Sequence, residues 1–179
     1  MAPADLRRIQ TGAAVSGVLS LQHDDCLSYW GIDDESMQRT AASLGLKMTR
    51  CPIRDFDIAD MRRCLPAAVK TLSSLISQSH RVYVHCTAGM GRAPLTVLGY
   101  LALVDRYHPD DAIRLILAAR PESVPAREAF EGCVADLAEQ HWEAIKRRAY
   151  DLYAQEINGD AHSDWVQAQG EILRTALTS

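Results

Sequence analysis

The chain has 179 residues, of which 47% are apolar, 6% aromatic and 23% charged. This balance indicates one soluble globular domain and excludes a disordered or fibrous chain. The formal net charge of −4 argues against a nucleic-acid partner or an anionic membrane, because both select basic surfaces. No apolar run approaches the roughly 18 residues of a membrane span, and the opening MAPADLRRIQTG resembles neither a signal peptide nor a transit peptide. These features indicate a mature or cytosolic protein.

Apolar patterns along the chain alternate between strand and helix. Short apolar runs predict strands over residues 14–21, 47–53 and 81–85. Helical periodicity predicts helices over 36–44, from Leu65 to Ile76 with Pro66 in the first turn, over 93–104, from Pro109 onward, and through Phe130 and Leu137. This alternation predicts an α/β fold in which a central, mostly parallel sheet is flanked by helices on both faces.

The last part of the chain differs from the rest in charge and pattern. Residues 1–130 carry 15 Lys and Arg against 14 Asp and Glu, whereas residues 131–179 carry 4 against 9, so an anionic substrate is expected to meet the first part. After Glu139, two amphipathic helical patterns flank the breaker Asn158-Gly159-Asp160. We expect a main domain over 1–139 and a helical extension over 140–179 packed on it through Trp142 and Trp165. The alternative is an independent docking module.

The cysteine pattern indicates a reducing compartment. The chain has five cysteines, an odd number, and none of them forms a CxxC pair. A disulfide framework or a zinc site is therefore not expected, and neither is another metal or a cofactor. Four cysteines lack the neighbouring glycines and arginine that mark the fifth, Cys86, and we expect them to pack in the interior: Cys26, Cys51, Cys64 and Cys133.

Residues 85–94, HCTAGMGRAP, lead from an expected strand into an expected helix. Backbone N–H groups in such a glycine-containing turn point inward at the helix N-terminus, where the helix dipole also favours negative charge, so a phosphate fits there without a metal. Arg92 would close the ring with a bidentate guanidinium, and the same field would favour the thiolate form of Cys86. Gly89 and Gly91 allow the close backbone approach. No Lys-Ser/Thr pair follows the glycines, which excludes a nucleotide-binding loop.

Three acidic residues, Asp55, Asp57 and Asp60, follow the expected strand 47–53. An alkoxide leaves phosphorus poorly unless it is protonated, so an enzyme acting on a phosphate ester needs a general acid, a role that a carboxyl group can fill. By position alone, each of the three is either that acid or a solvated loop carboxylate.

The segment HCTAGMGRAP resembles the signature of the dual-specificity phosphatases, which use a catalytic cysteine. Its Arg-Ala-Pro ending is similar to that of the plant and algal glucan phosphatases of the starch-excess-four and like-starch-excess-four branch. Residues 28–33 resemble the recognition motif of that branch, and residues 54–57 its variable-loop motif. The similarity covers about 15–138, and the tail resembles the helical C-terminal extension of the like-starch-excess members.

The resemblance implies roles for individual residues. Cys86 matches the nucleophile that forms a phosphocysteine, Arg92 the phosphate clamp, and Asp55 the general acid that later acts as base on water. The phosphate cradle corresponds to the backbone from the residue after the nucleophile through the clamp itself: Thr87, Ala88, Gly89, Met90, Gly91 and Arg92. The family uses no metal and no cofactor.

Aromatic contacts are expected as well, because sugar rings present apolar C–H faces that favour aromatic platforms. Within the resembling motifs these platforms are Tyr29, Trp30 and Phe56, and the alternative for each is core packing. Two positions depart from the family pattern. Ala93 stands where many protein-directed relatives have Ser or Thr, which implies slower hydrolysis of the phosphoenzyme. Val124, beside Pro125, stands where some relatives have an aromatic residue or glycine.

The resemblance implies a phosphoglucan phosphatase that removes phosphate monoesters from starch-like glucans through a phosphocysteine. The implied partners are phosphate and a phosphorylated glucan such as starch, amylopectin or a maltooligosaccharide. The implied location is a plastid, and the cytoplasm is the alternative. Two other functions stay open: a dual-specificity protein phosphatase acting on phosphotyrosine, phosphoserine or phosphothreonine, and a non-catalytic glucan-bound scaffold.

Overall fold

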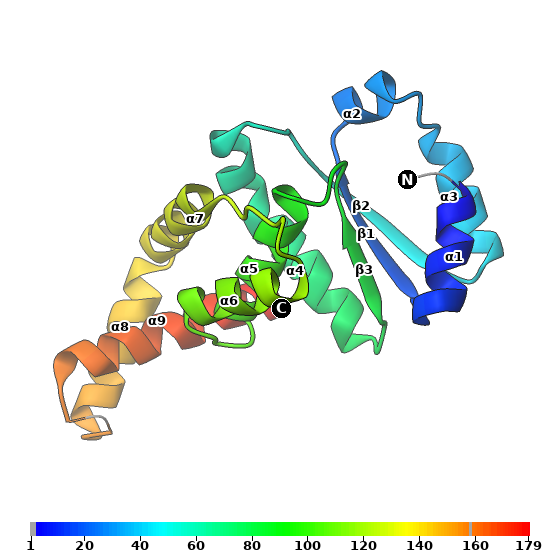
Figure 1. The fold of residues 1–179 in the computed structure, drawn as a ribbon. Coiled ribbons are helices and arrows are strands. Elements are labelled where there is room, and N and C mark those ends of the chain that lie inside the picture. The colour runs from blue at the N-terminus through cyan, green and yellow to red at the C-terminus, as the bar shows by residue number, and fades with distance from the viewer. Residues whose placement is uncertain (1–2, 158) are drawn as a thin grey trace.

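The computed structural model describes residues 3–157 and 159–179, and its fold is built around a parallel sheet (Figure 1). In the described residues the sheet has three strands in the order β2-β1-β3, with β1 parallel to both neighbours. The strands are β1 (Gly17–Gln22), β2 (Lys47–Ile53) and β3 (Val82–His85). The helices are α1 (Pro3–Ala13), α2 (Asp24–Tyr29), α3 (Asp34–Ser43), α4 (Ile58–Ser77), α5 (Arg92–Leu103), α6 (Pro109–Ala119), α7 (Arg127–Gln140), α8 (Trp142–Ala154) and α9 (Ala161–Thr178).

Strand β1 divides the interior into two cores because its side chains alternate between the faces of the sheet. Val18 is fully buried in a smaller core with Leu6 of α1 and Met37 of α3. Leu19 and Leu21 are fully buried in the larger core on the opposite face, which α4 and α5 cover. The α/β fold expected from the sequence, a parallel sheet with helices on both faces, is therefore confirmed (Figure 1).

The last two helices contribute to the larger core. Ile145 and Leu152 of α8 and Leu173 of α9 are buried there. Helix α9 also contacts α4, α5 and α7. The rings of Trp142 and Trp165 lie 4.8 Å apart, but Trp142 is 50% exposed, so it packs against its partner with only part of its surface. Of the expected breaker, Asn158 lies outside the described residues, whereas Gly159, with a positive φ of 78°, and Asp160, the N-cap of α9, lie between the two helices.

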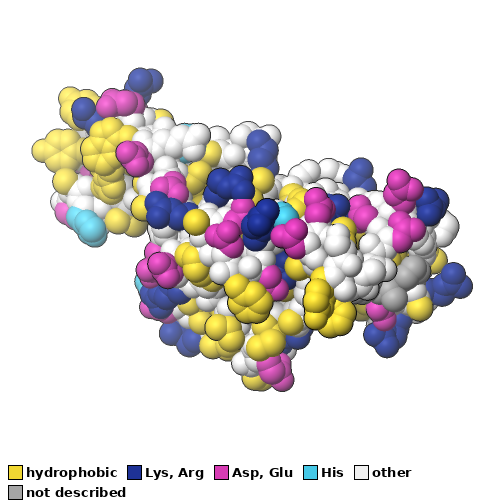
Figure 2. All heavy atoms as spheres, turned by 90° about the horizontal axis from the view of Figure 1, so that it is seen from above, with side chains coloured by type: hydrophobic (Ala, Val, Ile, Leu, Met, Phe, Trp, Pro, Cys, Tyr) yellow, Lys and Arg dark blue, Asp and Glu magenta, His cyan; other side chains and the backbone are white. Residues whose placement is uncertain are grey.

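The surface seen from above carries charged side chains of both signs among separate hydrophobic groups (Figure 2). One hydrophobic group lies at the end of the molecule where α8 and α9 meet (Figures 1 and 2). Large hydrophobic side chains exposed in these two helices and the segment between them include Tyr150, Tyr153, Ile157 and Val166. Among the described residues, no helix is both long and apolar enough to cross a membrane.

Helix α4 starts earlier than the sequence pattern predicts. Asp57 caps its N-terminus, where the carboxylate accepts a hydrogen bond from the backbone N–H of Asp60 at 2.9 Å. Pro66 consequently lies in the helix interior rather than in the first turn, so that expectation was wrong. The apolar residues counted from Leu65 onward form only the later part of the buried face, which also includes Met61.

Two helices were not predicted from the sequence. Helix α1 is largely polar, and among its residues 4–13 only Leu6 is fully buried. Helix α2 is a single short element whose end is fixed by the hydrogen bond from the Trp30 N–H to the Cys26 carbonyl, at 3.1 Å, followed by Gly31 with a positive φ of 59°. Such a left-handed glycine is a common way to end a helix. Because α2 follows β1 directly and ends at this point, Tyr29 and Trp30 lie near the carboxyl end of β1.

Candidate active site

The signature loop, which we define as residues 86–91, connects β3 to the N-terminus of α5. No side chain caps that N-terminus, and the first turn contains no acidic residue. Its backbone N–H groups are therefore available to an anion, and the helix dipole adds positive potential. Cys86 is buried, and the N–H of Gly89 donates to its Sγ at 3.3 Å. A hydrogen bond of this kind stabilises the thiolate more than the neutral thiol.

The guanidinium of Arg92 is completely buried beside this loop. Its Nη1 donates to the carbonyl oxygens of Ile53, at 2.9 Å, and Leu21, at 3.4 Å, which lie on β2 and β1. Its Nη2 donates to Asp55 Oδ2 at 2.7 Å and to Thr87 Oγ1 at 3.1 Å. Its buried Nε has no hydrogen-bond partner among the described residues. The strand ends thus hold a cation in place and leave one donor free for an anionic ligand.

The three candidate acids have different environments. Asp55 is partly exposed and paired with Arg92. Asp57 is occupied as the cap of α4. Asp60 is buried, and one of its carboxylate oxygens accepts the backbone N–H of Arg54 at 2.7 Å. That hydrogen bond is the main cause that holds the pKa of Asp60 below its ordinary value. Of the three, Asp55 is the carboxylate that contacts the buried guanidinium, whereas Asp57 and Asp60 hold the loop and the start of α4 in shape.

The three candidate aromatic residues surround one cavity of about 410 Å³, which Asp55 and Thr87 also line. Tyr29 is 80% exposed, Trp30 61% and Phe56 94%, so none of them is buried in a core. The Tyr29 and Trp30 rings meet edge to face, with centroids 5.1 Å apart. Phe56 has a positive φ of 58°, a conformation that costs a bulky residue about 1–2 kcal/mol. Such strain at an exposed aromatic residue is typical of functional sites.

The structure adds two residues to the site that the sequence pattern did not indicate. Cys26 was expected only to pack in the interior, but it is half-buried and its Sγ lies 3.5 Å from Arg92 Nη1. Gln22 is a buried polar residue at the end of β1, and its Nε2 donates to Thr87 Oγ1 at 3.4 Å. The only sequence signal for Gln22 is a polar residue at the carboxyl end of a buried strand, where parallel sheets commonly place ligand contacts.

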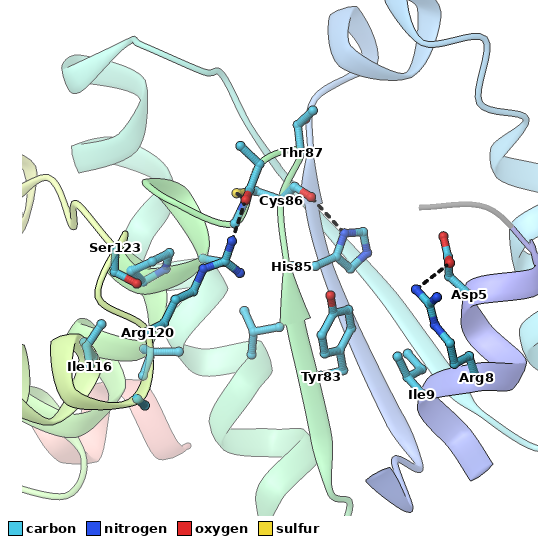
Figure 3. A pocket seen from close by; sticks show the side chains of 17 residues that line it. Asp5, Arg8, Ile9, Tyr83, His85, Cys86, Thr87, Ile116, Arg120 and Ser123 are labelled. Carbon is cyan, nitrogen blue, oxygen red and sulfur yellow. Dashed lines mark hydrogen bonds and ion pairs between the residues drawn. The ribbon is translucent and has the colours of Figure 1, made fainter. Parts of the chain in front are cut away.

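Behind the signature loop, His85 and Tyr83 of β3 line a second cavity of about 390 Å³ (Figure 3). His85 Nδ1 lies 3.1 Å from the Cys86 carbonyl oxygen, so Nδ1 carries the proton and donates to that oxygen. Burial is the main cause that lowers the pKa of His85 to about 4. The imidazole is therefore neutral at pH 7, and it fixes the backbone of the cysteine from the side of the sheet.

The other cysteines have surroundings unlike those of Cys86. Cys133 is buried, and burial is the main cause that raises the pKa of its thiol to about 12. Cys51 and Cys64 are half-buried against the larger core. Among the residues that the structure describes, no group of three or more His, Cys, Asp or Glu side chains is placed to hold a metal ion.

Comparison with known proteins identifies the class to which this fold and this loop correspond. Residues 31–137 match the model of the family "dual specificity phosphatase, catalytic domain". The chain belongs to this family. The solved structure of PTPMT1 shares 21% identity with a TM-score of 0.57, over 84% of this chain and 90% of that one. The active form of Tk-PTP shares 20% identity with a TM-score of 0.56, over 77% and 86%. These two likenesses concern the fold.

Several curated relatives are more similar in sequence. The chain is 34% identical over 137 residues to phosphoglucan phosphatase DSP4, amyloplastic, of Castanea sativa, which covers 75% of this chain and 36% of that protein. It is 35% identical over 89 residues to phosphoglucan phosphatase LSF1, chloroplastic, of Arabidopsis thaliana, covering 50% and 15%. Laforin of Mus musculus is 29% identical over 106 residues, covering 59% and 32%. The resemblance to the glucan phosphatase branch is confirmed, although the chain spans about a third or less of these relatives.

Proposed function

We propose that the protein hydrolyses phosphate monoesters on starch-like glucans through a phosphocysteine intermediate at Cys86. The observation that carries the substrate class is the exposure of Tyr29, Trp30 and Phe56 around a cavity that also contains Asp55 and Thr87. A neutral sugar offers no charge beyond its phosphate, so stacking on aromatic rings supplies the remaining contact. The phosphoglucan phosphatase names of two relatives support the same substrate class.

In the first step, the Cys86 thiolate attacks phosphorus, and the bond between phosphorus and the sugar oxygen breaks. The backbone N–H groups of the signature loop and the guanidinium of Arg92 bind the phosphate oxygens on which charge develops. Asp55, protonated, donates its proton to the departing sugar oxygen. The present pair between Arg92 and Asp55 supports this role, because a bound phosphate competes for the guanidinium and releases the carboxyl.

In the second step, water attacks the phosphocysteine, and the Asp55 carboxylate accepts one of its protons. The bond between sulfur and phosphorus breaks, inorganic phosphate leaves, and the thiolate is restored. The N–H of Gly89 donates to the sulfur, which supports a thiolate leaving group. Ala93 provides no hydroxyl to this sulfur, so we expect the second step to be slower than in relatives with Ser or Thr at that position.

The proposed substrate also indicates where in the cell the protein acts. Starch and amylopectin are plastid polymers, and the two plant relatives carry the words amyloplastic and chloroplastic in their names. We propose a plastid as the site of action.

Phosphate release from phosphorylated amylopectin, compared with release from a phosphotyrosine peptide at the same enzyme concentration, tests the substrate class. We expect clearly faster release from amylopectin. The Cys86→Ser variant, which keeps the backbone cradle and Arg92, serves as the blank for contaminating phosphatase. Release from the peptide alone would assign the protein to the protein phosphatases. Glucan binding without release by the unmodified protein would indicate a non-catalytic scaffold.

A further inference from the structure

The guanidinium of Arg120 lies against the signature loop (Figure 3), in the cavity that Cys86 and Gly89 also line. Its Nη2 donates to the carbonyl oxygen of Ala88 at 3.0 Å. Arg120 follows the last residue of α6, and its backbone N–H donates to Ile116 at 2.8 Å. Its own carbonyl accepts the N–H of Ser123 at 3.1 Å. The backbone of Arg120 is therefore anchored at the helix end, and its side chain reaches across to a single peptide unit of the loop.

That peptide unit joins Ala88 to Gly89 and has a donor on its other side. In a trans peptide the C=O and N–H groups point in opposite directions, and the described residues contain no cis peptide bond. The N–H of Gly89 points to Cys86 Sγ at 3.3 Å. Holding the Ala88 carbonyl outward consequently keeps the Gly89 N–H directed inward, at the sulfur and at the position of a bound phosphate.

Gly89 shows how closely the guanidinium approaches the loop. A Cβ added at this glycine would lie 2.6 Å from Arg120 Nη1, and the residue has a positive φ of 73°. Both facts favour glycine at this position, the first because the space is already filled by Arg120 and the second because L side chains rarely adopt that backbone. A second hydrogen bond from the same region holds the next part of the loop: the Val124 N–H donates to the Met90 carbonyl oxygen at 2.7 Å.

We propose that Arg120 is a positioning residue for the dephosphorylation reaction. It fixes the orientation of the peptide between Ala88 and Gly89, so that the Gly89 N–H stabilises the Cys86 thiolate and then a phosphate oxygen. Without the hydrogen bond from Arg120 to the Ala88 carbonyl, the peptide can rotate and present its carbonyl dipole to the anion instead. The inference rests on the proposed catalytic role of Cys86.

The test compares Arg120→Ala and Arg120→Lys with the control Arg114→Ala, which removes an exposed arginine of α6 that pairs with Asp111. On a small aryl phosphate, which lacks the glucan chain, we expect Arg120→Ala to lower kcat/KM by about 10- to 100-fold. The pH dependence of Cys86 alkylation by iodoacetamide should move to higher pH, because the thiolate has lost a fixed donor. Arg120→Lys should restore part of both, since an ammonium still donates one hydrogen bond to the carbonyl.

A merely structural role would lower the melting temperature without moving the alkylation profile, and that result would overturn the proposal. A loss confined to KM for glucan, with alkylation unchanged, would make Arg120 a substrate contact and would also overturn it. Gly89→Ala provides a second measurement. Its added methyl displaces the guanidinium, so we expect its loss and that of Arg120→Ala to be less than additive in the double variant. Fully additive losses would mean that the two residues act independently.

The Cys86→Ser variant separates this proposal from the function on which it rests. If that variant keeps its activity, the phosphocysteine mechanism fails and Arg120 has no nucleophile to position. If it is inactive while Arg120→Ala matches the unmodified protein in rate and alkylation, only the positioning role fails.

Discussion

The side chains of Arg92 and Asp55 form an ion pair, with Nη2 and Oδ2 2.7 Å apart. The arginine is fully buried, whereas the aspartate side chain keeps 34% of its surface exposed. A phosphate dianion entering the site competes with Asp55 for the guanidinium, because both are oxyanions and the phosphate has the larger charge. In the proposed mechanism, the displaced carboxyl of Asp55 then serves as the general acid beside the leaving oxygen.

Substrates with poor and good leaving groups distinguish Asp55 from Asp57 as the general acid. Asp55→Ala should slow the release of phosphate from a sugar ester by about 10²- to 10⁴-fold, because an alkoxide leaves only when protonated. An aryl phosphate should lose far less, since its leaving group needs little protonation. The measurement is kcat/KM on both substrates. Asp57→Ala should not discriminate between them, although it should lower the free energy of unfolding by about 1 kcal/mol through the lost helix cap. The reverse pattern would assign the acid to Asp57.

The exposed aromatic residues should carry selectivity for the glucan. Phe56→Ala or Tyr29→Ala should lower phosphate release from a phosphoglucan about tenfold, equivalent to about 1.4 kcal/mol of transition-state binding, and leave a small aryl phosphate nearly unchanged. Trp30→Ala should behave in the same way. Tyr150→Ala, which removes a 70% exposed tyrosine of α8, is the matched control and should change neither rate. Equal losses on both substrates would mean that the rings only keep the loop in shape.

Thiol reactivity should separate Cys86 from Cys133. Iodoacetamide at neutral pH should alkylate Cys86, because the Gly89 N–H and the start of α5 favour its thiolate, and added phosphate should protect it. Cys133 should not react in the folded protein, because burial raises the pKa of its thiol to about 12. Peptide mass mapping after a timed exposure measures both. Equal modification of the two residues, or no protection by phosphate, would contradict an anion site at the signature loop.

His85 should make the folded protein less stable in mild acid. Its pKa falls from 6.5 to about 4 on folding, chiefly through burial, so between these values the unfolded chain binds the additional proton. The contribution of His85 should therefore lower the free energy of unfolding as the pH decreases from 6.5 to 4, by up to about 3 kcal/mol. Above pH 6.5 its contribution should not change with pH. The carboxylate of Asp60, whose pKa is lowered from 3.8, affects the free energy of unfolding at more acidic pH values than His85 does.

Urea unfolding at a series of pH values measures this dependence. His85→Asn keeps a donor for the Cys86 carbonyl but does not titrate, so its curve should be flatter between pH 6.5 and 4. His162→Asn, at an exposed position of α9, is the control and should keep the slope of the unmodified protein. An unchanged slope in His85→Asn would show that the imidazole is accessible to protons in the folded state.

The sequence alone determined those features that depend on neighbouring residues. The segment 85–94 contains the cysteine, the glycines, the arginine and the start of a helix in one continuous stretch, so its loop geometry follows from local spacing. The strand predicted over 47–53 has the bounds of β2. The helices on both faces follow from apolar periodicity, which needs no knowledge of what they pack against.

Only the tertiary structure decided which separated residues meet. Asp55, Asp57 and Asp60 are alike in sequence, and they differ because one of them contacts the buried Arg92 whereas the others bind the backbone at the start of α4. Arg120 is one arginine among many until α6 ends beside the signature loop. Cys26 looked like a packing residue until α2 brought its sulfur to Arg92. Contacts of this kind depend on how strands and helices that are far apart in the sequence pack together. The local sequence pattern does not specify which of these distant residues come into contact.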